Sequence, residues 1–297
     1  MSHVATLISN PARPAVTDAA VSAARTALLG ARPAVVLAQG IAADIPTPTG
    51  GADPRAIADR VRARLGGAPI DVVVQPLAER KKRLFVVDMD STMIEQECID
   101  ELADYVGLKP RVAAITERAM RGEIEFEPAL RERVTLLRGL PVSVVDEVIA
   151  KRITLMPGGR TLVATMRANG AYTCLVSGGF TLFTETIAAM LGFNEQRANR
   201  LVIENGRFAG RVEEPILGRD AKLASLRQLT EHLKLSREQT LAAGDGANDL
   251  PMIEAAGLGV AFHAKPVVAE TAHARIDHGD LTALLYLQGY RREEFVA

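Results

Sequence analysis

The chain has 297 residues, of which 48% are hydrophobic and 24% are charged, and its formal net charge is −1 at pH 7. This length predicts about two domains, and the apolar share is sufficient for a large buried core. A charge so close to zero gives no reason to expect a nucleic acid or an anionic membrane as a partner. Cys98 and Cys174 have no metal-binding spacing, so we expect two ordinary buried thiols in a reducing compartment.

The chain also lacks the sequence features of membrane insertion and export. No apolar run reaches about 18 residues, and the first residues do not show a basic and then apolar signal-peptide profile. We therefore expect a cytoplasmic protein without a membrane span. The sequence leaves the oligomeric state open, with a homodimer as one expectation.

Residues 1–78 have the pattern of a small α+β module. Strands are expected at 4–8, 33–38, 41–45 and 70–74, and helices at 17–29 and 53–65. Asp53 and Pro54 suit the cap and first-turn positions of the second helix. The resulting β-α-β-β-α-β order is compatible with a ferredoxin-like sandwich. The module contains no cluster of catalytic residues.

Residues 79–297 alternate between strands and helices, with one helical interruption. Phe85–Val87 has the character of a short buried strand, and residues from about 93 to 155 have a helical pattern throughout. Beyond this insertion, strands are expected at 171–176, 201–204, 207–212, 240–243, 259–262 and near 275–277, and helices at 158–168, 181–191, 221–233 and 250–256. Asn205-Gly206 predicts a hairpin turn. The alternation predicts an α/β fold with a doubly wound, largely parallel sheet and an inserted helical cap.

Two aspartates follow the first strand of this sheet. Asp88 and Asp90 lie two residues apart in an extended segment, so both carboxylates can face one ligand beyond the strand's carboxyl end. Two like charges held this close need a cation or a catalytic task. The alternative is a plain turn leading into a helix N-cap, because Asp90, Ser91 and Thr92 are residue types favoured there.

Two later strands end in polar residues of similar character. These residues are Ser177, Gly178 and Gly179 after one strand and Asp245, Asn248 and Asp249 after the other. The carboxyl ends of parallel strands line one crevice, where Asp88 and Asp245 with carbonyl and water oxygens suit Mg²⁺. The serine hydroxyl and glycine N–H groups suit a phosphate, with a plain strand-to-helix turn as the alternative. Lys222 would complete a phosphoryl site, unless it is a solvated lysine.

Missing motifs narrow the phosphoryl chemistry. The chain has no G-x-x-x-x-G-K-[ST] motif, so a P-loop nucleotidase is not expected. Neither cysteine is followed by an arginine six positions later, and the five histidines show no metal or nucleophile pairing. A carboxylate remains as the nucleophile, through an aspartyl phosphate.

Taken in order, Asp88-x-Asp90-Ser-Thr, Ser177-Gly-Gly, Lys222 and Gly244-Asp-Gly-x-Asn-Asp resemble the four motifs of the haloacid-dehalogenase-like hydrolases. The first motif with Glu97, and the cap residues Met120, Phe126 and Arg133, are similar to the phosphoserine phosphatase branch of that family. The resemblance covers about residues 81–290. The module before it is similar only in outline to ACT-like domains.

The resemblance implies roles for these positions. It makes Asp88 the nucleophile and Asp90 the general acid and later the base. The phosphate would be held by Ser177, Gly178, Lys222 and Asn248, and Mg²⁺ by Asp88, Asp245 and the backbone carbonyl of Asp90, with Asp249 in support. Glu97, Met120, Phe126 and Arg133 would bind the rest of the substrate.

The implied reaction is hydrolysis of O-phospho-L-serine to L-serine and phosphate, the last step of serine biosynthesis. One alternative is another small phosphomonoester, or transfer of the phosphoryl group to an alcohol. A different class of function is a binding module in which residues 1–78 sense an amino acid and the α/β part is incidental. The complete set of acids, lysine and metal ligands speaks against that class.

Arg133 can also be interpreted without any family. A helix over residues 128–137 places Arg133 near the middle of an arc formed by Ala129, Leu130, Val134, Leu136 and Leu137. An arginine within an apolar stripe needs an anion, and a substrate carboxylate would serve. The alternative is a structural ion pair with a glutamate of the cap. Glu97 could bind an ammonium group, or it could be a solvated acid at a helix start.

Overall fold

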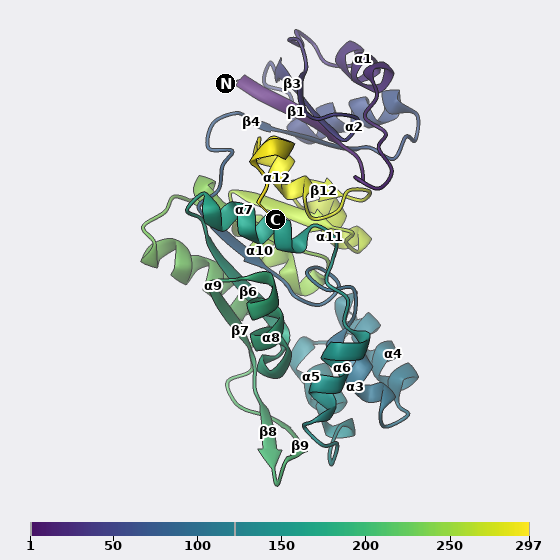
Figure 1. The fold of residues 1–297 in the computed structure, drawn as a ribbon, viewed down its shortest axis with the longest axis vertical. Helices are drawn as coiled ribbons and strands as arrows, with labels where there is room; N and C mark the ends of the chain where they lie inside the picture. The colour runs from purple at the N-terminus through teal and green to yellow at the C-terminus, as the bar shows by residue number, and fades with distance from the viewer. Residues whose placement is uncertain (1, 122, 297) are drawn as a thin grey trace.

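The computed structural model describes residues 2–121 and 123–296, without the side chains of Ser2, Met120 and Arg219. Its backbone has three parts that follow one another along the long axis of the molecule (Figure 1). A small sheet with two helices lies at one end, a large sheet in the middle, and a group of helices beside a β-hairpin at the other end. Within the described residues, no helix is long and apolar enough to cross a membrane.

The N-terminal part is a four-stranded antiparallel sheet with the order β2-β3-β1-β4. Its elements are β1 (Ser2–Ile8), α1 (Asp18–Thr26), β2 (Val35–Ala38), β3 (Ala42–Pro48), α2 (Pro54–Leu65) and β4 (Asp71–Pro76). Asp53 caps α2 by accepting from the backbone N–H of Arg55 at 3.1 Å, and Gly66 ends the helix at φ 62°. Leu7 and Val61 belong to the apolar layer between the sheet and its helices.

The second face of this sheet packs on the central part of the molecule. Ile8 and Val73 share a core cluster with Leu284 and Tyr286, near the C-terminus. The carboxylate of Asp71 adds polar contacts, because it accepts hydrogen bonds from the backbone N–H groups of residues 277, 278 and 279. Both faces of the N-terminal sheet are therefore covered.

A buried ion pair also joins the two parts. Arg80 donates to Asp44 Oδ2 at 2.6 Å, to Thr6 Oγ1 at 3.3 Å and to the carbonyls of Tyr286 and Leu287 at 3.1 Å each. The side chains of Arg80 and Asp44 are only 10% and 9% exposed. The guanidinium thus connects the N-terminal sheet with the end of the chain.

We expect Arg80→Ala to lower the free energy of unfolding by about 3 kcal/mol, because it leaves a buried carboxylate without its partner. The matched control is Arg211→Ala, which breaks the Arg211–Glu204 pair of 61% and 60% exposed side chains and should cost less than about 1 kcal/mol. Urea denaturation measures both. Equal losses would show that the contact between the two parts adds no stability.

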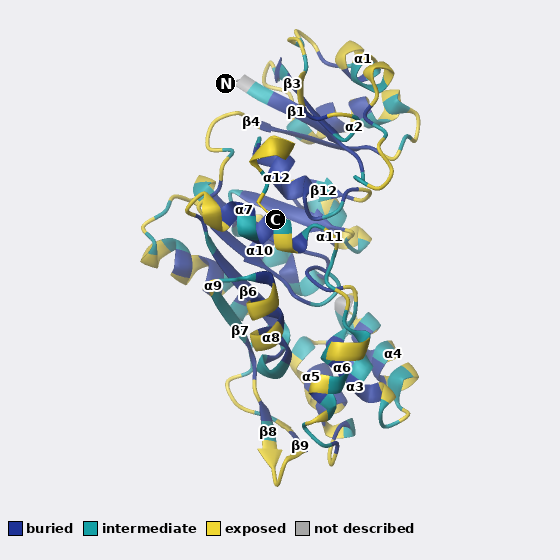
Figure 2. Ribbon diagram, viewed as in Figure 1, coloured by how far each residue is buried: buried dark blue, intermediate teal, exposed yellow. Residues whose placement is uncertain are grey.

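The central part is a six-stranded parallel sheet, which confirms the predicted α/β fold. Its order is β12-β11-β10-β5-β6-β7, with β5 (Leu84–Val87), β6 (Tyr172–Phe180), β7 (Glu195–Asn199), β10 (Thr240–Gly244), β11 (Leu258–Phe262) and β12 (Ala274–Ile276). Side chains of β5 alternate between the two faces, so Leu84 and Val86 lie in one core cluster and Phe85 and Val87 in another. One face is covered by α9 (Arg219–His232) and α10 (Leu250–Ala255), and the other by α7 (Gly159–Ala168) and α8 (Thr181–Leu191). Figure 2 shows this sheet as a largely buried layer.

One strand and two α-helices of the central part have no counterpart among the predicted elements. They are β7, α11 (Pro266–Thr271) and α12 (Ala283–Leu287). Strand β7 has the sequence E-Q-R-A-N, and as an edge strand it carries no apolar alternation. The two helices have six and five residues, too few to establish a helical period.

The third part lies between β5 and α7. It contains α3 (Cys98–Asp104), α4 (Lys109–Met120), α5 (Phe126–Leu136) and α6 (Val144–Arg152). The segments that enter and leave it run side by side, because Ile94 bridges Leu155 and Met156 donates to the carbonyl of Met93 at 2.9 Å. These helices are therefore attached to the sheet by one paired connection.

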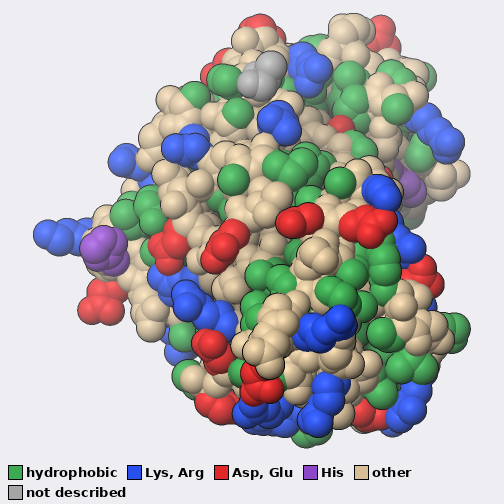
Figure 3. Space-filling view, turned by 60° about the horizontal axis from the view of Figure 1, so that its bottom comes forward, with side chains coloured by type: hydrophobic (Ala, Val, Ile, Leu, Met, Phe, Trp, Pro, Cys, Tyr) green, Lys and Arg blue, Asp and Glu red, His purple; other side chains and the backbone are tan. Residues whose placement is uncertain are grey.

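A hairpin lies against these helices. Strands β8 (Leu201–Glu204) and β9 (Arg207–Val212) meet at Asn205 and Gly206, both with positive φ, which confirms the predicted turn. Phe208 of β9 exchanges backbone hydrogen bonds with Gly139 and Leu140 just after α5. Figure 3 shows this end of the molecule with acidic and basic side chains intermingled.

Candidate active site

The site is built on the three central strands of the parallel sheet. β5 lies between β10 and β6, so the carboxyl ends of these strands are adjacent. Asp88 follows β5 directly, Asp245 follows β10, and Ser177 to Gly179 form the last part of β6. This edge is where open parallel sheets form a crevice, as the sequence predicts.

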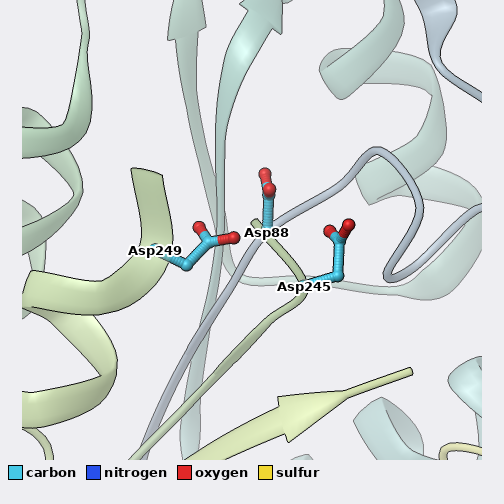
Figure 4. A group of neighbouring side chains, drawn as sticks. All are labelled: Asp88, Asp245 and Asp249. Carbon is cyan, nitrogen blue, oxygen red and sulfur yellow. The ribbon is translucent and has the colours of Figure 1, made fainter. Parts of the chain in front are cut away.

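Three carboxylates meet at this edge. One oxygen from each of Asp88, Asp245 and Asp249 lies within 4.8 Å of the other two, and all three residues are buried (Figure 4). Asp245 also accepts from Thr92 Oγ1 at 3.1 Å. Burial, and then the negative charge of Asp249, raise the pKa of Asp88 to about 7, and the same two causes raise the pKa of Asp245 well above its usual range. The raised pKa values show that these carboxylates need a nearby cation to be ionised together.

Lys222 supplies part of the positive charge. Its ammonium lies 2.7 Å from Asp88 Oδ1 and 2.6 Å from Asp249 Oδ1, and the residue is 2% exposed. Although burial opposes its charged form, Asp249 and Asp88 raise the pKa of Lys222 above its ordinary value. The alternative of a solvated lysine is wrong.

The donor set fits a hard divalent cation. When all three carboxylates are ionised, they and the one ammonium sum to a charge of −2 at a buried site. All three acidic side chains offer oxygen atoms, and these are the ligands that hard cations such as Mg²⁺ prefer. Asp249 belongs to this cluster together with Asp88 and Asp245.

Asp90 lies beside the cluster and is half-buried. Its Oδ1 accepts from the backbone N–H of Cys98 at 3.2 Å. A Cβ at Gly179 would lie 3.1 Å from its Oδ2, so a larger residue there would crowd this carboxylate. Burial, and then the charge of Asp88, raise the pKa of Asp90 to about 7. This carboxyl group can therefore both carry and release a proton near neutral pH.

The segment Ser177 to Gly179 forms a second wall. Ser177 Oγ accepts from the backbone N–H of Gly179 at 2.9 Å. A Cβ at Gly178 would lie 2.8 Å from the ring of Phe126, which comes from α5. A ring from the helical part thus rests directly on this glycine.

Arg133 lies in the buried stripe of α5, as the helical arc predicts. It is 5% exposed and donates to Thr116 Oγ1 at 2.9 Å and to the carbonyl of Ala129 at 3.1 Å. Among the described residues it forms no ion pair; burial lowers the pKa of Arg133, and the charges of Glu97 and Asp100 oppose that shift. Thr116 in turn donates to Asp100 Oδ1 at 3.0 Å.

Glu97 is the N-cap residue of α3 and is only partly exposed. It accepts from Ser91 Oγ at 2.7 Å. Burial, and then the charge of Asp90, raise the pKa of Glu97 to about 8. The alternative of a solvated acid at a helix start is wrong.

One cavity of about 520 Å³ connects these groups. Its lining from the strand ends includes Asp88, Asp90, Ser177, Gly178 and Asn248, and its lining from the helical part includes Glu97, Phe126 and Arg133. Lys222, Asp245 and Asp249 lie behind this surface. The predicted contribution of Met120 falls on a side chain outside the described residues.

Two buried polar residues of the site have no counterpart among the predicted ones. Thr116 lies on the same buried face of α4 as Val112. A polar residue at a position that the helical period assigns to the core could have indicated a functional role. Asn199 ends β7, is 2% exposed and donates to the carbonyl of Gly178 at 2.9 Å. The polar edge strand that carries Asn199 gives no comparable signal.

Comparisons with known proteins agree with this geometry. Residues 85–254 match the haloacid dehalogenase-like hydrolase family. A phosphoserine phosphatase of Streptomyces coelicolor is 47% identical over 231 residues, which are 78% of this chain and 56% of the relative. The chain thus spans little more than half the length of that relative. A phosphoserine phosphatase of Albidiferax ferrireducens is 46% identical over 74% of this chain and 95% of its own length.

A solved structure extends the similarity to the N-terminal part. The unliganded crystal structure of a probable phosphoserine phosphatase from Vibrio cholerae has a TM-score of 0.74 and 30% identity. The match covers 97% of this chain and 86% of that protein. The chain therefore belongs to the haloacid dehalogenase-like hydrolases.

Proposed function

We propose that the protein hydrolyses O-phospho-L-serine to L-serine and phosphate through an aspartyl phosphate. The observation that carries this proposal is the shared cavity: one wall holds carboxylates, a serine hydroxyl and glycine N–H groups, and the other holds a buried arginine and a glutamate. The first set suits a phosphoryl group, and the second suits the carboxylate and ammonium of an amino acid. The names of the relatives support the same substrate.

We assign three parts to this function. Residues 79–297 would be the hydrolase domain, with a helical cap at about residues 93–155. Residues 1–78 would be an ACT-like module, and the strand order β2-β3-β1-β4 with two helices on one face supports a ferredoxin-like arrangement. The cap supplies Glu97, Phe126 and Arg133 to the cavity, so substrate choice would reside in the cap.

Phosphatases of this family use a divalent metal, and we propose Mg²⁺ at the carboxylate cluster. Asp88, Asp245 and the backbone carbonyl of Asp90 would hold it, with Asp249 supporting the site through Lys222 and the N–H of Gly246. When bound, the cation offsets the repulsion between the Asp88 carboxylate and the phosphate oxygens.

In the first half-reaction, a carboxylate oxygen of Asp88 attacks phosphorus while the bond to the seryl oxygen breaks. Lys222 favours the ionised form of Asp88, because its ammonium lies 2.7 Å from the carboxylate. Asp90 gives its proton to the departing seryl oxygen. The products of this step are serine and the acyl phosphate on Asp88.

In the second half-reaction, Asp90 takes a proton from a water molecule as that water attacks phosphorus. The bond from phosphorus to the Asp88 oxygen breaks, which restores the Asp88 carboxylate and releases inorganic phosphate. The Ser177 hydroxyl, the Gly178 N–H and the Asn248 amide would hold the phosphate oxygens in both steps.

Arg133 and Glu97 would recognise the serine moiety. Arg133 Nη2 makes no hydrogen bond to the described residues, so a substrate carboxylate can accept from it. An ammonium group near Glu97 would lower the raised pKa of that acid and hold it ionised. The two charges are complementary to an amino acid.

A hydrolysis screen of small phosphomonoesters with and without Mg²⁺ tests the proposal. We expect phosphoserine to be the preferred substrate, chelation with EDTA to abolish turnover, and Mg²⁺ to restore it. Full activity in the chelated enzyme would contradict the metal assignment. Preference for another phosphomonoester, or phosphoryl transfer to an added alcohol, would favour the alternative substrate classes. Serine binding without any hydrolysis would favour an amino-acid-sensing role.

The cytoplasmic location and the homodimer stay predictions. Light scattering of the purified protein tests the second of them. Neither bears on the assignment of the residues in the cavity.

A further inference from the structure

Asn199 occupies a buried position between two segments that frame the cavity. It is the last residue of β7 and is 2% exposed. Its amide nitrogen donates to the carbonyl of Gly178 at 2.9 Å and to the carbonyl of Leu217 at 3.1 Å, and its Oδ1 accepts from the N–H of Leu217 at 2.7 Å. Both amide hydrogens and the carbonyl oxygen are thus engaged.

These bonds fix the peptide unit between Gly178 and Gly179. Its carbonyl accepts from Asn199, and its N–H donates to Ser177 Oγ at 2.9 Å. Two successive glycines have wide backbone freedom, so without these hydrogen bonds the Gly178–Gly179 peptide could rotate. With both ends held, the Ser177 oxygen is used as an acceptor, and its own hydrogen remains available for a ligand.

The same bonds hold Gly178 and Gly218 at a fixed distance from each other, and the ring of Phe126 packs against both glycines. A Cβ at Gly178 would lie 2.8 Å from the Phe126 ring, and a Cβ at Gly218 would lie 3.3 Å from it. Gly218 follows Leu217 directly, so the hydrogen bonds of Asn199 connect the two segments that contact the Phe126 ring. Movement of either segment would therefore shift both the surface that contacts the Phe126 ring and the position of the Ser177 hydroxyl.

We propose that Asn199 is a positioning residue for the phosphoryl group: it holds the Gly178–Gly179 peptide and the Leu217 segment in register, so that the Ser177 hydroxyl, which accepts from the Gly179 N–H, stays aimed at the phosphate. Asn199 itself touches no reacting atom. The proposal rests on the proposed phosphomonoester chemistry of this cavity, but not on the identity of the alcohol part of the substrate.

Asn199→Asp tests the proposal, because it keeps the shape and the acceptor for the Leu217 N–H while removing both amide donors. We expect kcat/KM to fall about tenfold to a hundredfold, by a similar factor for phosphoserine and for 4-nitrophenyl phosphate, since the two esters share only the phosphoryl group. The inhibition constant for inorganic phosphate should rise, while the ratio of activities on the two esters stays as in the parent enzyme.

The matched control is Asn194→Asp, which makes the same chemical change just before β7. The side chain of Asn194 uses only its Oδ1, which accepts from the N–H and the hydroxyl of Thr173 at 3.0 and 3.1 Å, at the end of the sheet remote from the cavity. We expect parent-like kinetics from this variant. Asn199→Ala, which adds no charge, provides a second test if Asn199→Asp does not fold.

Three results would overturn the proposal. One is a lower melting temperature for both Asn199 variants with unchanged kcat and unchanged phosphate inhibition, which would make Asn199 purely structural. Another is a loss confined to phosphoserine, which would place its effect on the serine moiety. The third is an equal kinetic loss in Asn194→Asp. If the parent enzyme prefers another phosphomonoester, the comparison is made on that ester, and only the assignment of phosphoserine fails.

Discussion

Asp88→Asn is expected to abolish phosphoserine hydrolysis and Asp90→Asn to slow it by about 10²–10⁴-fold. The two acids are neighbours, but the proposed mechanism makes different demands on them. Asp88 must be ionised to attack phosphorus, and Lys222 Nζ at 2.7 Å favours that form. An amide at position 88 has no comparable nucleophilic oxygen, so no acyl phosphate can form.

Asp90 must instead give a proton and later take one. Burial, and then the charge of Asp88, raise its pKa to about 7, so the protonated form is well populated at neutral pH. Asn at position 90 retains the backbone carbonyl proposed as a metal ligand, but it can transfer no proton. Metal and substrate should therefore still bind to Asp90→Asn.

Intact-mass measurement after a rapid quench separates the two variants. With 4-nitrophenyl phosphate, whose leaving group needs no proton, Asp90→Asn should accumulate one phosphate per chain on Asp88, and Asp88→Asn should accumulate none. The control is Asp220→Asn, which removes an exposed acid at the rim of the same cavity and should behave as the parent does. A phosphorylated Asp88→Asn protein would contradict the assignment of the nucleophile.

Arg133→Ala is expected to lower kcat/KM for phosphoserine by about a hundredfold, because a buried, charge-assisted contact to the substrate carboxylate is lost. An aryl phosphate without a carboxylate should be affected only a few-fold, through the repacking of α5. The expected effect lies mainly in KM, since the contact is distant from the reacting atoms.

Arg131→Ala is the matched control on the same helix. Arg131 is exposed and pairs with Glu214 at 2.5 Å and with Glu127 at 3.7 Å, so its removal takes away an arginine without opening the cavity. Steady-state kinetics of both variants on both substrates make the comparison. Equal losses of the two substrates in Arg133→Ala would return Arg133 to a structural role.

The parallel α/β sheet and the residues at the ends of its central strands could be predicted from the order of residue types. This was possible because each signal is local: a β-branched run that stops at Asp88, a Ser-Gly-Gly segment, and a Gly-Asp-Gly segment before Asn248. The buried place of Arg133 was also local, because a helix of known period gives the direction of each side chain.

The burial of each charged side chain and the groups that face it depend on how distant segments pack together. Lys222 and Glu97 look like ordinary surface residues in the sequence, and only the packing of α9 and α3 against the strand ends encloses them. Asp249 joined the carboxylate cluster for the same reason, since its distance to Asp88 depends on two strands that are far apart in the chain.

Long-range contacts also decided the roles of Asn199 and of the N-terminal sheet. The strand that carries Asn199 has no apolar pattern, because it lies at the edge of the sheet and is held there by its neighbour β6. The second face of the N-terminal sheet is covered by residues near the C-terminus, such as Tyr286. Such pairings depend on the closure of long loops, which no local pattern of residue types records.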